Sequence, residues 1–282
     1  MRFNLTLLPI NLVFLTSFMV IAMASNAPDV NAYISEIKEF DYKNFRLDYL
    51  SWLLLWLLNI DNIFIFHLTS LIVFSLIVFQ CKRKKNEDYI ALAALMPMIL
   101  GSQIRLLFAA ATFIFVLQYF KYYRTILIPT LVASLFHFSF LFSFLLPLLI
   151  FFGPLFDFIM PIEIVVAYNT KLDAYLEKDE EVASVPGKAL LLILLSLNFI
   201  LLAKQKDFRA FFVLIYILLI PYIESQTWMI FRRSVELILF ISYPFYFNNN
   251  KKNDNYKIAF FITLYCYLIL NSIGYVKKLD LL

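Results

Sequence analysis

The sequence predicts an all-α protein, a polytopic bundle of transmembrane helices. Of its 282 residues 62% are hydrophobic and 16% are charged, whereas a soluble domain is nearer half apolar and a quarter charged. The apolar residues form long runs between short polar loops, and a run of about 20 such residues spans a bilayer. The chain holds 32 phenylalanines and only 4 glycines, so we expect helix packing to rest on large side chains rather than on GxxxG contacts.

Composition and motifs exclude several functions. The net charge is +4 and the basic residues fall in loops, where they act as topology signals rather than as nucleic-acid contacts. The two cysteines, Cys81 and Cys266, have no disulfide or metal spacing. There is no P-loop and no GxGxxG, HExxH or GxSxG motif. We therefore expect neither a metal nor a cofactor, and no nucleic-acid partner.

The chain is predicted to emerge at the outer face of the membrane after its first apolar segment. Residues 3–24 form the first apolar segment, although Ala22-Met23-Ala24 also resembles the cleavage site of a signal peptide. Residues 25–60 are predicted to be an outer loop, polar over 25–50. Its last part, YLSWLLLWLLNI, is too short to span and carries two tryptophans, which favours an interfacial helix at 49–60.

The remaining apolar segments are oriented by their flanking charges. Residues 62–80 precede the basic run Cys81–Lys85, which the positive-inside rule places in the cytoplasm. Residues 139–168 fit either one span or a two-span hairpin; the hairpin puts the acidic loop 169–187 outside and the next basic loop inside, and we adopt it. The total is about eleven spans, some of them short or broken. The other predicted spans are 89–101, 104–120, 125–138, 188–203, 210–223, 234–247 and 257–275.

Residues 101–139 are predicted to be the core hairpin of this single membrane domain of 1–282. Gln103 and Arg105 open its first helix, and His137 closes its second. A membrane hairpin returns both ends to one surface, which the charge bias identifies as the outer one. A charged residue at a span end costs little, whereas one placed deeper in the membrane costs about 3 kcal/mol or more and usually marks function.

Three further charged residues, Glu224, Arg232 and Arg233, are predicted in a later outer loop. The positive-inside rule places most basic residues in the cytoplasm, so arginines in an outer loop need another explanation. A guanidinium binds phosphate bidentately, which offers one. Two or three of them at the outer surface are suited to a lipid pyrophosphate. His137 or Glu224, or an acid of the first outer loop, is then the candidate for proton transfer.

Each of these residues has a structural alternative. Arg105 reaches lipid headgroups if it only snorkels from a helix end. His137 is a polar residue at the end of a span. Arg232 and Glu236 are spaced i,i+4 on one helix and can simply pair. Which of Arg232 and Arg233 acts stays open.

The order of these residues resembles the EpsG-like family of polysaccharide polymerases, a Wzy-like group. Gln103-Ile104-Arg105 is followed by Val132-Ala133-Ser134-Leu135-Phe136-His137-Phe138-Ser139, similar to the family's Q-x-R and L-A-S-x-x-H-x-S. Asp29 and Tyr33 look like the start of its first outer loop, and Asp48-Tyr49 like a pair near that loop's end. Arg232 or Arg233 is similar to its late outer arginine.

The sequence also departs from the family pattern. No arginine precedes Asp29, and Leu106 follows Arg105 where glutamine is frequent. Leu50 stands near the position of a frequent acidic residue. The identity of the catalytic base therefore stays open.

The resemblance implies an enzyme of the bacterial cytoplasmic (inner) membrane. It would polymerise undecaprenyl-pyrophosphate-linked oligosaccharide repeats into capsular, exopolysaccharide or O-antigen chains at the outer face, beside a flippase and a chain-length regulator. Arg105 with Arg232 or Arg233 would hold the pyrophosphate, and His137 or Glu224 would serve catalysis. Gln103, Asp29, Tyr33 and Asp48 would make further substrate contacts. The alternatives are another lipid-linked glycosyltransferase, an O-antigen ligase-like enzyme, a transporter of lipid-linked sugars, and a structural membrane protein.

Overall fold

A computed structural model describes residues 28–41, 43, 48–83, 104–117, 127–141, 143–144, 185–223, 228–242 and 254–278. Every regular element in these ranges is a helix and none is a strand, which confirms the all-α class. The chain divides into two compact units, residues 1–138 with 268–282 and residues 139–267. Several predicted features lie outside the described residues: segment 3–24, span 89–101, Gln103, most of 139–168, loop 169–187 up to residue 184, and Glu224.

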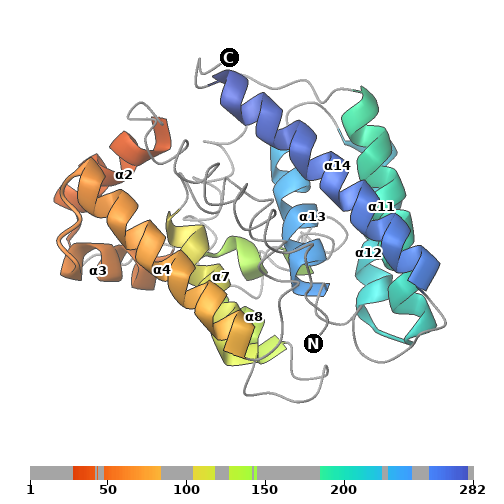
Figure 1. The fold of residues 1–282 in the computed structure, drawn as a ribbon, viewed down its shortest axis with the longest axis horizontal. Coiled ribbons are helices and arrows are strands. Elements are labelled where there is room, and N and C mark those ends of the chain that lie inside the picture. Colours follow the sequence, from red (N-terminus) through yellow and green to blue (C-terminus); the bar gives the residue numbers. More distant parts are fainter. Residues whose placement is uncertain are drawn as a thin grey trace, which may run out of the picture. The chain divides into compact units, whose positions relative to one another are not determined.

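The first unit is built from neighbouring helices that pack in pairs (Figure 1). Helix α2 contacts α3 and α4, α4 contacts α7, and α7 contacts both α3 and α8. These contacts bring the start of α3 to the start of α7, although more than fifty residues separate them in the chain. The helices are α2 Pro28–Lys38, α3 Tyr49–Leu57, α4 Ile63–Arg83, α7 Ile104–Leu117 and α8 Leu127–Ser134.

The second unit contains a helical hairpin, in which α11 and α12 run side by side (Figure 1). Helix α12 continues into a short 3-10 helix and also contacts α13. Helix α14 begins in this unit and ends in the first. The bounds are α11 Val185–Lys204, α12 Arg209–Leu219, the 3-10 helix Ile220–Tyr222, α13 Trp228–Ser242 and α14 Asp254–Lys278.

Within the ranges that the structure describes, the long apolar segments are helical where the sequence predicts helices. Helices α4, α7, α11, α12 and α14 lie within a few residues of predicted segments, and α3 matches the short helix expected at 49–60. One helix of the described residues, α11, is both long and apolar enough to cross a membrane, over Gly187–Lys204. Three other apolar helices are shorter, Ile63–Ile77, Ile104–Leu117 and Arg209–Tyr222. The number of about eleven spans stays a prediction.

The polar stretch 25–50, predicted as part of an outer loop, contains the helix α2, which the sequence did not predict. Val30, Tyr33 and Ile37 recur at spacings of three and four, and all three are buried. They pack on Trp52 and other apolar residues of α3, α4 and α7, which form one core cluster. The charged residues on the other side of α2 hid this amphipathic pattern, because the segment as a whole is polar.

Two helix ends differ from the prediction. Helix α13 begins at Trp228 rather than near residue 234, so Arg232 and Arg233 lie inside a helix and not in a loop. Helix α8 ends at Ser134, whereas a span to 138 was expected. His137 therefore lies just after the helix, where its N–H still donates to a carbonyl of the last helical turn, that of Ala133.

Candidate functional site

Arg105 lies in the first turn of α7 and is held by two side chains from earlier elements. Its Nη1 donates to the Asp48 carboxylate oxygen Oδ2 at 3.2 Å. Its Nη2 donates to the hydroxyl oxygen of Tyr33, on α2, at 3.4 Å. These contacts fix the planar guanidinium in one orientation, and they use two of its five N–H donors.

Two aromatic rings pack on the same guanidinium. Its central carbon lies 4.5 Å from the ring centroid of Trp52 and 4.9 Å from that of Tyr33. Such cation–π contacts contribute about 0.5–2 kcal/mol each, more where water is excluded. The Arg105 side chain is only 15% exposed, and its Nε is buried without a hydrogen-bond partner among the described residues. Arg105 is thus a desolvated, pre-oriented cation.

Asp48 joins this arginine to the segment that contains His137. Its backbone is left-handed (φ 64°, ψ 30°), a conformation that aspartate tolerates better than most residues. The Asp48 carbonyl accepts the N–H groups of Ser51 and Trp52 and so starts α3. The fully buried carboxylate uses Oδ2 for Arg105 and Oδ1 for the backbone N–H of Phe138, at 2.5 Å.

His137 lies between two residues that are hydrogen-bonded to the start of α3. Phe138 donates to Asp48, and the carbonyl of Phe136 accepts from the Ser51 hydroxyl at 2.5 Å. The His137 N–H donates to the carbonyl of Ala133, in α8. His137 itself is buried, with 8% of its surface exposed. Its backbone is therefore held from both sides.

The structure brings together four of the predicted site residues: Tyr33, Asp48, Arg105 and, through its neighbours, His137. Asp29 lies in the first turn of α2, and its side chain is not among those described. Sequence reasoning missed Ser51 and the contact of Trp52 with Arg105. The signal for Ser51 was weak, a single hydroxyl in an apolar helix; Trp52 was noticed only as an interfacial residue.

Arg232 and Arg233 belong to the second unit. Arg232 Nε lies 3.8 Å from Glu236 Oε1, so the i,i+4 pairing expected as the alternative for Arg232 is present. The Tyr267 hydroxyl, on α14, donates to the same Glu236 oxygen at 3.2 Å. Both side chains of the ion pair are nearly buried, 13% exposed for Arg232 and 12% for Glu236.

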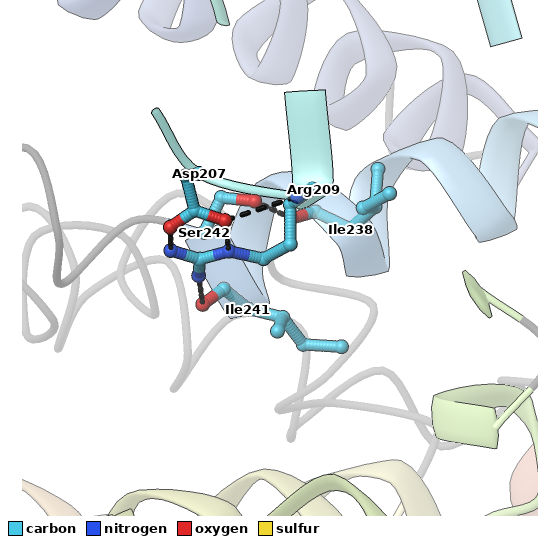
Figure 2. Close-up of polar contacts among 5 residues, drawn as sticks. All are labelled: Asp207, Arg209, Ile238, Ile241 and Ser242. Carbon is cyan, nitrogen blue, oxygen red and sulfur yellow. Dashed lines mark hydrogen bonds and ion pairs between the residues drawn. The ribbon is translucent and has the colours of Figure 1, made fainter. Parts of the chain in front are cut away.

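A second buried arginine has a structural explanation. Arg209 is fully buried, and its guanidinium makes two hydrogen bonds to the Asp207 carboxylate, from Nε at 2.8 Å and from Nη2 (Figure 2). Its Nη1 donates to the carbonyl of Ile241 in the last turn of α13 at 3.4 Å. The terminal carbonyls of a helix have no partner within it. Arg209 therefore caps α13 and attaches it to the α11–α12 turn.

Among the described residues no group of three histidine, cysteine or acidic side chains is placed to hold a metal ion. Comparison of the chain with protein families, with curated proteins and with solved structures finds no match. The chemistry of the site is therefore inferred from its residues: a desolvated, rigid cation for an anionic group, beside a histidine fixed by its backbone.

Proposed function

We propose that this chain is a multi-pass enzyme of the bacterial cytoplasmic membrane. It polymerises undecaprenyl-pyrophosphate-linked oligosaccharide repeats into capsular, exopolysaccharide or O-antigen chains at the outer face. The observation that carries the proposal is the Arg105 site: a guanidinium held by Asp48 and Tyr33, packed on Trp52, next to the segment of His137. The sequence resemblance to EpsG-like polymerases rests on the same Gln103–Arg105 and His137 motifs.

The reaction needs a cation and a proton acceptor. A sugar hydroxyl of the next repeat attacks the anomeric carbon of the growing chain. The bond from that carbon to the pyrophosphate oxygen breaks, and undecaprenyl pyrophosphate leaves with the electron pair. Arg105 is suited to the negative charge that develops on the pyrophosphate, because pre-oriented donors in a water-poor site stabilise such charge strongly. His137, or Glu224 in its place, takes the hydroxyl proton.

Membrane insertion is supported by apolar faces that no other described residue covers. Helix α4 exposes Phe64, Leu68, Ile72 and Leu76, which recur every four residues along one side of the helix. A contiguous apolar stripe of this kind marks a membrane or protein contact. Together with the apolar span in α11, in the second unit, it favours contact of both helices with lipid chains.

The test in cells compares Arg105→Ala and His137→Ala with two controls. Lys38→Ala removes an exposed cation of α2, and His67→Gln removes the only other histidine. We expect short or absent surface polymer in the two site variants and normal lengths in both controls. Unchanged long chains in both site variants would contradict the assignment. A single added repeat, without polymer, would instead favour a ligase-like glycosyltransferase.

A further inference from the structure

The first turn of α3 contacts both sides of the candidate site. Asp48 accepts one hydrogen bond from Arg105 and one from the N–H of Phe138. Ser51, one turn along the helix, donates to the carbonyl of Phe136. The arginine and the two neighbours of His137 are thus tied to a single helical turn. Neither Ser51 nor the backbone at 136–138 carries chemistry of its own.

We propose that Asp48 and Ser51 are positioning residues that set the placement of Arg105 relative to His137. The inference rests on the proposed function for what the two positioned groups do, but not for how they are held. Asp48 orients the guanidinium that binds the pyrophosphate. Ser51, with Asp48, fixes the backbone on both sides of His137. Asp48 thus acts through Arg105 and His137 and not as a direct substrate ligand.

Geometry favours this division of roles. The Asp48 carboxylate has no exposed surface, and each of its oxygens already accepts a hydrogen bond from the protein. A buried carboxylate with both oxygens already hydrogen-bonded is poorly placed to contact a substrate. It does restrain the two groups that it contacts. Ser51 is fully buried as well. Side chains that hold a functional group within a fraction of an ångström typically lie behind it in this way.

Two conservative substitutions separate the roles of the turn. Asp48→Asn keeps an amide oxygen for the Phe138 N–H but places an N–H₂ donor opposite Arg105. Ser51→Ala removes the hydroxyl bonded to Phe136 and leaves Arg105 untouched. Ser51→Thr keeps that hydroxyl. Ser70→Ala is the matched control, since Ser70 is equally buried but bonds only within α4, to the carbonyl of Phe66.

The first measurement does not depend on activity. His67 and His137 are the only two histidines, so in a His67→Gln background diethyl pyrocarbonate reports on His137 alone. We expect Ser51→Ala to raise its modification rate severalfold, with Ser51→Thr and Ser70→Ala at the parent rate. An unchanged rate in Ser51→Ala would overturn the role of Ser51. This result stands even if the chain proves not to be a polymerase.

The second measurement uses the purified chain in lipid vesicles with a synthetic undecaprenyl-pyrophosphate-linked repeat. We expect Asp48→Asn to raise KM about tenfold with a smaller change in kcat, because binding to a mis-oriented arginine is lost. Ser51→Ala should lower kcat about tenfold at similar KM, because His137 is misplaced. Equal effects of both variants on both constants would contradict separate positioning roles. If Asp48→Asn does not fold, Ser51→Ala and its threonine control decide alone. Absence of any product with the parent chain would refute the proposed function instead.

Discussion

At the scale of single residues, Arg105 brings a charge into a largely apolar unit. Burying an unpaired charge costs several kcal/mol, and a partner offsets this only with good geometry. Asp48 supplies the opposite charge, Tyr33 an acceptor, and Trp52 a ring face. The stability of this site therefore depends on the set of contacts, and the residues should not act independently.

A double-mutant cycle tests that dependence. Asp48→Ala leaves Arg105 without its counter-ion, so we expect a loss of about 3–5 kcal/mol in the free energy of unfolding. Arg105→Ala should cost less in the Asp48→Ala background than in the parent chain. The difference, the coupling energy, should be about 1–3 kcal/mol. Denaturant unfolding in detergent micelles measures both. Additive losses would show that the two residues do not interact.

The site residues differ in how far the sequence predicts them. Arg105, His137, Asp48 and Tyr33 are ionisable or aromatic residues in a recognisable order, so the sequence points to them. Ser51 is missed, because one hydroxyl in an apolar helix indicates nothing by itself. The N–H of Phe138 belongs to the backbone, and only the tertiary structure shows that Asp48 reaches it.

At the scale of elements, α2 is the helix that composition concealed. Its polar face led to the prediction of an outer loop at residues 25–50, while its buried face follows the helical period. The apolar segments were predicted more closely, because long apolar runs identify helices without reference to a partner. An amphipathic helix of 11 residues depends instead on packing, which the local sequence does not show.

A proline substitution tests the helix directly. Ser35 is exposed near the middle of α2, and proline in a helix interior costs about 3 kcal/mol. We expect Ser35→Pro to lower the unfolding free energy by roughly that amount, and Ser35→Ala to leave it unchanged or slightly raised. Tolerance of the proline would indicate an irregular segment.

The α11–α12 turn is a second element whose role the sequence did not reveal. Its residues 204–209 were predicted to be a basic loop, yet Asp207 and Arg209 are buried and attach α13. The pair depends on contact with α13, where Ile241 lies 32 residues beyond Arg209 in the chain. Charge alone therefore suggested a solvated turn.

Removing one member of this pair should be worse than removing both. Arg209→Met leaves the Asp207 carboxylate buried and unpaired, and we expect a loss of about 3–5 kcal/mol. In Asp207→Leu/Arg209→Met no buried charge is left, so part of that loss should be recovered. Thermal or denaturant unfolding compares the three proteins. A double variant less stable than Arg209→Met would show that the Asp207 carboxylate stabilises the turn without the guanidinium, through the backbone N–H of Arg209 that it accepts.

At the scale of the whole molecule, topology is the main prediction still to be tested. The all-α class followed from composition, and the sequence orients the chain through its loop charges. In the hairpin interpretation of 139–168 the turn at Lys206 is cytoplasmic, while Asp61, before α4, is outside. A single span through 139–168 places Lys206 at the outer face instead.

Cysteine labelling distinguishes these two arrangements. With Cys81 and Cys266 replaced by serine, the chain contains no other cysteine. We expect an impermeant maleimide to label Asp61→Cys and Tyr222→Cys on intact cells, and Lys206→Cys only after permeabilisation. Labelling of Lys206→Cys from outside, with Tyr222→Cys protected, would support the single span.

The most direct measurement incubates the purified chain in lipid vesicles with undecaprenyl-pyrophosphate-linked repeats and separates the products by size. We expect a ladder of increasing repeat number from the parent chain, lost in Arg105→Ala and retained in Lys38→Ala. Absence of a ladder with the parent chain, or an undiminished ladder in Arg105→Ala, would contradict polymerisation at the Arg105 site.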